Sequence, residues 1–135
     1  MRRIHNIVGL VGILTFVLTG QVMARHSPPM KTLEDGRRLM YISRHIYLLG
    51  TSVVNLMLGL YLQMDESPWR RWLQTVGSVL LVVSPVPIAL AFAFEPEQGL
   101  AGRSARSLVG LLMLLGGAVL HFVASAGRAP ELTGR

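Results

Sequence analysis

The stretch "WLQTVGSVLLVVSPVPIALAFAF", residues 72–94, decides the fold of this chain. It runs for 23 residues without Asp, Glu, Lys or Arg. A helix needs about 20 mainly apolar residues to cross the hydrocarbon core of a bilayer. A lipid-exposed segment must also satisfy its own backbone hydrogen bonds, which a helix does. The stretch therefore predicts a membrane-spanning helix.

Three further blocks lack these charged residues, namely 7–24, 46–62 and 108–124. The connections between the blocks are short, so successive helices should be antiparallel neighbours. We therefore predict an all-α integral membrane protein with four transmembrane helices in an up-down antiparallel bundle. The whole chain, residues 1–135, forms one domain, with spans at about 6–24, 44–63, 72–94 and 106–125.

The first block also resembles a cleavable signal peptide in part. It follows the basic "MRR" and ends near the small residue Ala24. The apolar region of a signal peptide is usually 7 to 15 residues long, however, and this block has 18. We expect a retained span.

Composition supports a membrane protein and limits its chemistry. Hydrophobic residues make up 51% of the chain and charged residues 15%, against roughly a quarter charged in soluble domains. The net charge of +6 lies in the connections and at span ends, where lipid phosphate is a more suitable partner than nucleic acid. The absence of cysteine excludes disulfides, thiolate metal sites and cysteine nucleophiles.

The segment "SPPMKTLED", residues 27–35, indicates where the second helix begins. Thr32 with Asp35 three residues later is similar to a capping box, so we expect this helix to start near residue 33. Counting back about 20 residues from Gln63 puts Arg44 at the hydrocarbon boundary. Its side chain could then extend to lipid phosphate. We interpret four residues as anchors at the membrane surfaces: Arg44, Tyr41, Trp69 and Trp72.

The "SPVP" sequence at residues 84–87 predicts a kink in the third span. Pro85 and Pro87 lack the N–H groups that would bind the carbonyls of Leu81 and Val83. Ser84 is suitably placed to satisfy one freed group. The kink serves packing, or else forms a hinge or a cavity wall.

The four histidines fall near span ends. In an up-down bundle His5 and His121 lie on the side of the termini, and His26 and His45 on the opposite side. At 100° per residue, His45 begins a polar stripe on the second helix that includes Arg38, Ser52 and Asn55. His5 and His121 lie on stripes of small residues.

These stripes permit two interpretations. Small and polar residues let membrane helices approach closely and hydrogen-bond to one another, which is a structural role. Alternatively, histidines on facing helices could ligate the iron of haem b. The candidate haem ligands are His45, His121, His5 and His26. No other metal site is predicted.

We expect a small accessory, assembly or scaffold subunit of a membrane complex, and not an enzyme by itself. Its partners would be the lipid bilayer and another membrane protein or a second copy of the chain. One alternative is a haem-b electron-transfer protein. Another is a small-molecule or ion transporter, although Glu95 is the only acidic residue that directly abuts a span.

The expected location is the bacterial inner (plasma) membrane. The 13 basic residues divide between the two sides without a clear bias, so the positive-inside rule does not fix the orientation. The leading "MRR" favours cytoplasmic termini. The side of the termini holds Arg2, Arg3, Arg70, Arg71, Arg128 and Arg135, and the other side holds Arg25, Lys31, Arg37, Arg38, Arg44, Arg103 and Arg106.

Overall fold

The computed structural model describes residues 1–98 and 105–126, and this part of the chain is helical without strands. Arg103, Arg128 and Arg135 therefore lie outside the described residues. The elements are α1 (Arg2–Ala24), a short 3₁₀ helix η1 (Met30–Thr32), α2 (Asp35–Tyr61), α3 (Pro68–Val83), α4 (Pro85–Gln98) and α5 (Ala105–Ser125). The predicted all-α fold is confirmed.

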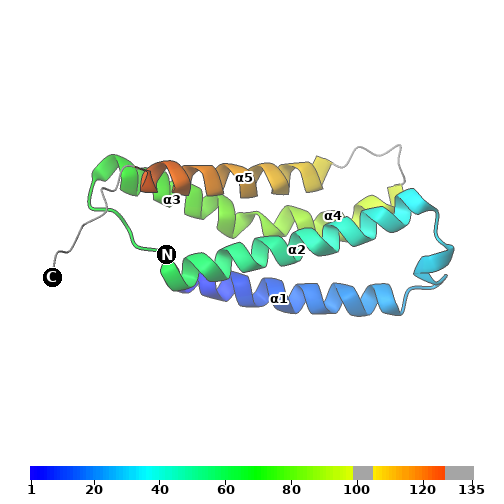
Figure 1. Ribbon diagram of the computed structural model, residues 1–135. Helices are drawn as coiled ribbons and strands as arrows, with labels where there is room; N and C mark the ends of the chain where they lie inside the picture. Colours follow the sequence, from blue (N-terminus) through cyan, green and yellow to red (C-terminus); the bar gives the residue numbers. More distant parts are fainter. Residues whose placement is uncertain (99–104, 127–135) are drawn as a thin grey trace.

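The helices lie roughly side by side (Figure 1). Helix α1 packs along α2, α2 packs along α4, and α5 packs along α3 and α4. The start of α1 and the end of α5 lie at the same end of the molecule (Figure 1). We call this the terminal end, and the end with η1 and the last turns of α4 the distal end.

Three helical segments are long and apolar enough to cross a membrane: Arg2–Ala24, Pro68–Pro96 and Ala105–Ser125. The second of these contains both α3 and most of α4. Helix α2 is not among the three, although it is 27 residues long. Its buried face explains this, because that face carries Arg44, Thr51, Ser52 and Asn55, which lower its mean hydropathy.

The start of α2 differs from the prediction. Thr32 belongs to η1, and its hydroxyl donates to the carbonyl of Pro29 at 2.8 Å. Helix α2 begins two residues later than expected, after Glu34, and no side chain caps it. The capping box was wrong because Thr32 ends η1 and bonds within that turn, and Glu34, not Thr32, directly precedes α2.

The predicted break at the prolines is present. Helix α3 ends at Val83 and α4 begins at Pro85, with Ser84 between them. The hydroxyl of Ser84 donates to the carbonyl of Leu81 at 3.0 Å, so one group freed by the prolines is satisfied as expected. The two halves of this segment pack on different neighbours: α3 packs mainly on α5, whereas α4 packs on both α2 and α5 (Figure 1).

Glycines hold two helix pairs at very short separation. A Cβ atom at Gly77 would lie 2.9 Å from the carbonyl oxygen of Gly117, and one at Gly117 would lie 2.8 Å from that of Gly77. Between α1 and α2, Gly9 faces Leu56 in the same way. The small stripes predicted from sequence therefore face inward, and contacts within the chain occupy them.

Candidate functional site

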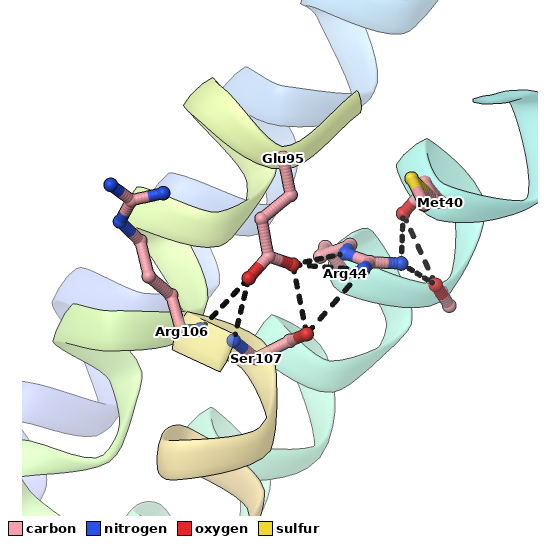
Figure 2. Close-up of polar contacts among 6 residues, drawn as sticks. Met40, Arg44, Glu95, Arg106 and Ser107 are labelled. Atoms are coloured by element: carbon pink, nitrogen blue, oxygen red, sulfur yellow. Dashed lines mark hydrogen bonds and ion pairs between the residues drawn. The ribbon is translucent and has the colours of Figure 1, made fainter. Parts of the chain in front are cut away.

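The buried polar side chains gather in two places. The first, which we call the ion-pair cluster, consists of Arg44, Glu95 and Ser107 near the distal end (Figure 2). The second, which we call the histidine cluster, consists of His5, Asn55, Ser78 and His121 nearer the terminal end. Each cluster joins residues from at least three helices.

In the ion-pair cluster, α2 and α4 meet through opposite charges. Arg44 donates from Nη2 to Glu95 Oε2 at 2.8 Å and from Nε to the same oxygen at 3.0 Å. The Arg44 side chain is 7% exposed and that of Glu95 is 2% exposed. Arg44 also donates from Nη1 to Ser43 Oγ at 3.0 Å. Because both charges are removed from solvent, the pairing and its hydrogen bonds must offset a large desolvation cost.

Glu95 also caps the first turn of α5. Its Oε1 accepts hydrogen bonds from the backbone N–H groups of Arg106 at 2.9 Å and Ser107 at 3.1 Å, and its Oε2 accepts one from Ser107 Oγ at 2.8 Å (Figure 2). A helix N-terminus has unpaired N–H groups and a partial positive charge, so it stabilises a carboxylate there. Glu95 therefore joins three helices through one carboxylate.

The interpretation of Arg44 as a lipid anchor was wrong. Its side chain turns into the protein because Glu95 lies opposite it and compensates the buried charge. Sequence reasoning placed Glu95 in a connection, whereas it lies within α4. The two residues are 51 positions apart in the sequence. The sequence signal for their pairing was weak: one basic and one acidic residue, each at a span end on the same side of the membrane.

The other predicted anchors divide into two kinds. Trp69 and Trp72 are 55% and 65% exposed at the start of α3, which suits a membrane surface. Tyr41 does not fit its predicted role, since it is 6% exposed. Its ring lies 5.3 Å from that of His26 and 5.4 Å from that of Phe92, so these two rings pack against it and help to bury it.

The histidine cluster connects α1, α2 and α3. His5 Nδ1 lies 2.8 Å from Asn55 Oδ1, and both side chains are fully buried. The amide nitrogen of Asn55 donates to the carbonyls of Thr51 and Leu81, each at 2.9 Å. Since that nitrogen is the donor, Oδ1 accepts from His5 and the histidine proton lies on Nδ1.

Leu81 explains why the two prolines matter for this cluster. In a regular helix its carbonyl would accept the N–H of residue 85, which is proline here. The carbonyl instead accepts Ser84 Oγ from its own chain segment and Asn55 Nδ2 from α2. The kink therefore supplies the acceptor that positions Asn55, which in turn positions His5.

His5 retains an unused ring nitrogen. Its Nε2 is buried and has no hydrogen-bond partner in the part of the chain that the structure describes. The other histidine of this cluster, His121, lies on α5. His121 Nε2 is 3.1 Å from Ser78 Oγ. Ser78 was missed from sequence because it does not differ from other serines within spans.

His45 and His26 lie apart from this cluster. His45 Nδ1 donates to Thr19 Oγ1 at 2.8 Å, and its ring stacks on Phe16 with 4.0 Å between centroids. The His45 side chain is half-buried, and a Cβ atom at Gly20 would lie 3.3 Å from its Cε1. His26 follows α1 and donates from Nδ1 to the carbonyl of Pro28 at 2.7 Å.

The residues of the polar stripe on α2 differ in burial and in their partners. Ser52 is fully buried, and its hydroxyl donates to the carbonyl of Leu48 beside Gly12 of α1. Arg38 lies outside the interior and pairs with Asp35 on its own helix at 2.9 Å, with 39% of its side chain exposed. The stripe thus begins at the surface and becomes buried along α2.

Haem b fits these residues poorly. Of the four candidate ligands, His5 alone keeps a buried ring nitrogen without a partner among the described residues. The contact between Gly77 and Gly117 closes the space beside His121, since a Cβ at Gly77 would lie 3.0 Å from His121 Cδ2.

Searches with protein-family models, curated proteins and solved structures found no match to this chain.

Proposed function

We propose that this chain is a four-span protein of the bacterial inner membrane, with cytoplasmic termini, that acts as an accessory or scaffold subunit for another membrane protein. The observation that carries the proposal is the contrast between an apolar surface and an interior that holds paired polar side chains. The outer helices expose large apolar side chains, while the buried polar groups mostly bind one another across helices. A partner would then be met within the bilayer.

The outermost helices offer the contact surfaces. Leu10, Leu14 and Val17 lie at i, i+4 and i+7 on α1 and are 51% to 64% exposed. The same spacing on α5 presents a second surface, formed by Leu108, Leu112 and Leu115, which are 56% to 62% exposed. Both surfaces suit lipid or an apolar helix of a partner.

Helix α2 is proposed as the fourth span. Its polar side chains point into the protein, where Glu95, His5 and the Leu81 carbonyl bind them. Its outward side chains include Ile46, Met57 and Leu60, which are more than half exposed. A span with satisfied polar groups inside and apolar residues outside is stable in lipid despite modest mean hydropathy.

Labelling of single cysteines tests the topology directly, because the chain has no cysteine of its own. Ser27→Cys precedes α2 and Glu66→Cys follows it, and both positions are exposed. If α2 spans the membrane, a membrane-impermeant maleimide labels position 27 in intact cells and position 66 only after lysis. Equal labelling of both in intact cells would show that α2 does not cross.

Site-specific photocrosslinking tests the accessory role. A photoreactive amino acid at Leu14 or Leu115 should give one discrete protein adduct in native membranes, from one outer helix and not from both. The matched control is the inward position Leu48, which is 1% exposed and should give no adduct with another protein. A chain that yields only lipid adducts at both outer positions contradicts the proposal.

Haem b remains a second candidate because of one observation. His5 presents a buried, unprotonated Nε2 whose opposite nitrogen donates to Asn55, an arrangement typical of metal-bound histidine. An absorption spectrum of protein expressed with ample haem tests it. A Soret band lost in both His5→Ala and His121→Ala would support haem, and colourless protein would remove it.

A transporter role has less support. A proton-coupled transporter needs an acidic residue that exchanges protons with a pathway across the membrane. Glu95 is the buried acid among the described residues, and Arg44, Ser107 and the N-terminus of α5 bind its carboxylate. Those bonds hold it in a structural role.

A further inference from the structure

A continuous apolar groove runs between α1 and α4, and residues of α2 also line it. Its first part encloses about 240 Å³ and has Leu48 of α2 among its lining residues. Its second part encloses about 370 Å³ and is lined by Tyr41 of α2. The two parts share Thr15 on α1 and Ala89 on α4, so they form one channel open to the side. The groove lies within the apolar length of the spans.

One face of α1 forms a wall of this groove and ends in a positive charge. Ile7, Val11, Leu18 and Val22 line the groove at i, i+4, i+11 and i+15. Arg25 follows at i+18, which returns to the azimuth of Ile7 at 100° per residue. Its guanidinium is therefore in line with the groove and just beyond the last helical turn, where α1 ends at Ala24.

A third hollow connects the groove to that charge. It encloses about 470 Å³ and shares Leu18 and Val22 with the second part. Its other lining residues are polar: Gln21, Arg25 and His26. The groove thus changes from apolar to cationic at the distal end, where α1 ends.

In a membrane, an apolar groove on the lipid-facing side does not stay empty, because its walls would lose contact atoms. The two apolar parts of the groove, at about 240 and 370 Å³, are lined mainly by apolar side chains. A single acyl chain is thin enough to enter.

The cationic end determines the type of lipid. Arginine binds phosphate through several N–H donors and keeps its charge at all physiological pH values. Near a membrane surface, a basic residue attracts anionic lipid headgroups. Arg25 is exposed, so its guanidinium is accessible to a headgroup.

We propose that this chain binds one anionic phospholipid, with an acyl chain in the groove between α1 and α4 and the phosphate at Arg25. The groove supplies affinity for any diacyl lipid, and Arg25 with its polar neighbours supplies preference for the anionic headgroup. This lipid site does not depend on the accessory role, because it is complete within one chain.

Native mass spectrometry of the detergent-purified full chain tests the site with phosphatidylglycerol and phosphatidylcholine. The wild type should retain one phosphatidylglycerol at lipid concentrations at least fivefold lower than those needed for phosphatidylcholine. Arg25→Gln should abolish that preference and leave weak binding of both lipids. Ala93→Trp, placed at an exposed position in the groove wall, should weaken both.

Arg106→Gln is the matched control, since Arg106 is exposed at the same membrane side on α5 and its side chain lies over Phe94, away from the groove. It should keep the wild-type preference. Equal binding of the two lipids by wild type, or the same loss in Arg106→Gln as in Arg25→Gln, would overturn the proposal. Circular dichroism of each variant shows that the helices are retained, so loss of lipid reports on the site.

Discussion

Arg44 on α2 and Glu95 on α4 form an ion pair, with 2.8 Å between Nη2 and Oε2, in the interior of a helical membrane protein (Figure 2). The same carboxylate binds two backbone N–H groups of α5. The pair therefore fixes the relative positions of three helices at the distal end. Removing either charge would leave its partner buried without compensation.

Glu95→Gln should destabilise the protein strongly. The neutral amide cannot compensate the buried guanidinium of Arg44, and breaking a buried ion pair costs about 3–5 kcal/mol. The free energy of unfolding in mixed detergent micelles, followed by circular dichroism, measures the loss. Arg44→Met should cost a similar amount, because the carboxylate then loses its cation.

The double variant Arg44→Met/Glu95→Met separates pairing from packing. With both charges removed the cost should fall well below the sum of the single variants, since hydrophobic replacements of a buried pair are often close to neutral. Asp35→Asn is the control, because the Asp35–Arg38 pair is exposed and should contribute at most about 1 kcal/mol. Additive losses in the double variant would show that the two residues act independently.

Much of the fold could be predicted because its signals are local. The length of apolar blocks predicted helices, and Pro85 with Pro87 predicted the break after Val83. The start of α2 was misplaced because a Thr with Asp three residues later resembles a cap regardless of where the hydroxyl points, and Thr32 bonds to Pro29. The proposal that α2 is a span depends on partners from other helices, which no window of its own sequence contains.

The buried clusters were predicted only in part for the same reason. Helical phase placed Ser52 and Asn55 on one stripe, and both are fully buried. One partner of Asn55 on another helix is the backbone carbonyl of Leu81, which has no side-chain signature. Arg44 was misread because a basic residue at a span end is typical of a lipid anchor, and only the distant Glu95 changes that interpretation.

Asn55→Leu should weaken the terminal end of the bundle. The substitution removes the acceptor of His5 Nδ1–H and a donor to Leu81, and each buried polar group left unpaired costs about 1–3 kcal/mol. Unfolding in mixed micelles again gives the value. His5→Leu/Asn55→Leu should lose less than the two single variants together. Thr75→Val is the control, since its hydroxyl bonds only to the carbonyl of Arg71 on its own helix.

Two adjacent glycines on α5 should differ sharply in their tolerance of a side chain. Gly117→Val forces a Cβ to within 2.8 Å of the Gly77 carbonyl, so α3 and α5 must separate, at a cost of about 1–3 kcal/mol or more. Gly116→Val meets only Leu80 Cδ1 at 3.7 Å, an ordinary contact. The difference in unfolding free energy between these variants measures the α3–α5 contact, and equal values would contradict the observed packing.

Replacing both prolines should straighten the helical segment Pro68–Pro96 and move α4 away from α2. In Pro85→Ala/Pro87→Ala the N–H of residue 85 becomes available to the Leu81 carbonyl and competes with Asn55 for it. A kink of roughly 20° over the 14 residues of α4 displaces its far end by about 7 Å.

Spin labels at Ile46 and Leu90, both exposed, report the separation of α2 from α4 by pulsed electron resonance. We expect a longer or broader distance distribution in the double proline variant. Labels at Val79 and Val119 report the α3–α5 pair, and their distance should not change, because the Gly77–Gly117 contact holds those helices on the other side of the break. An unchanged distance between the labels at Ile46 and Leu90 would contradict this prediction. In that case α4 would keep its direction although its hydrogen-bond ladder is continuous, so tertiary packing and not the prolines would set the bend.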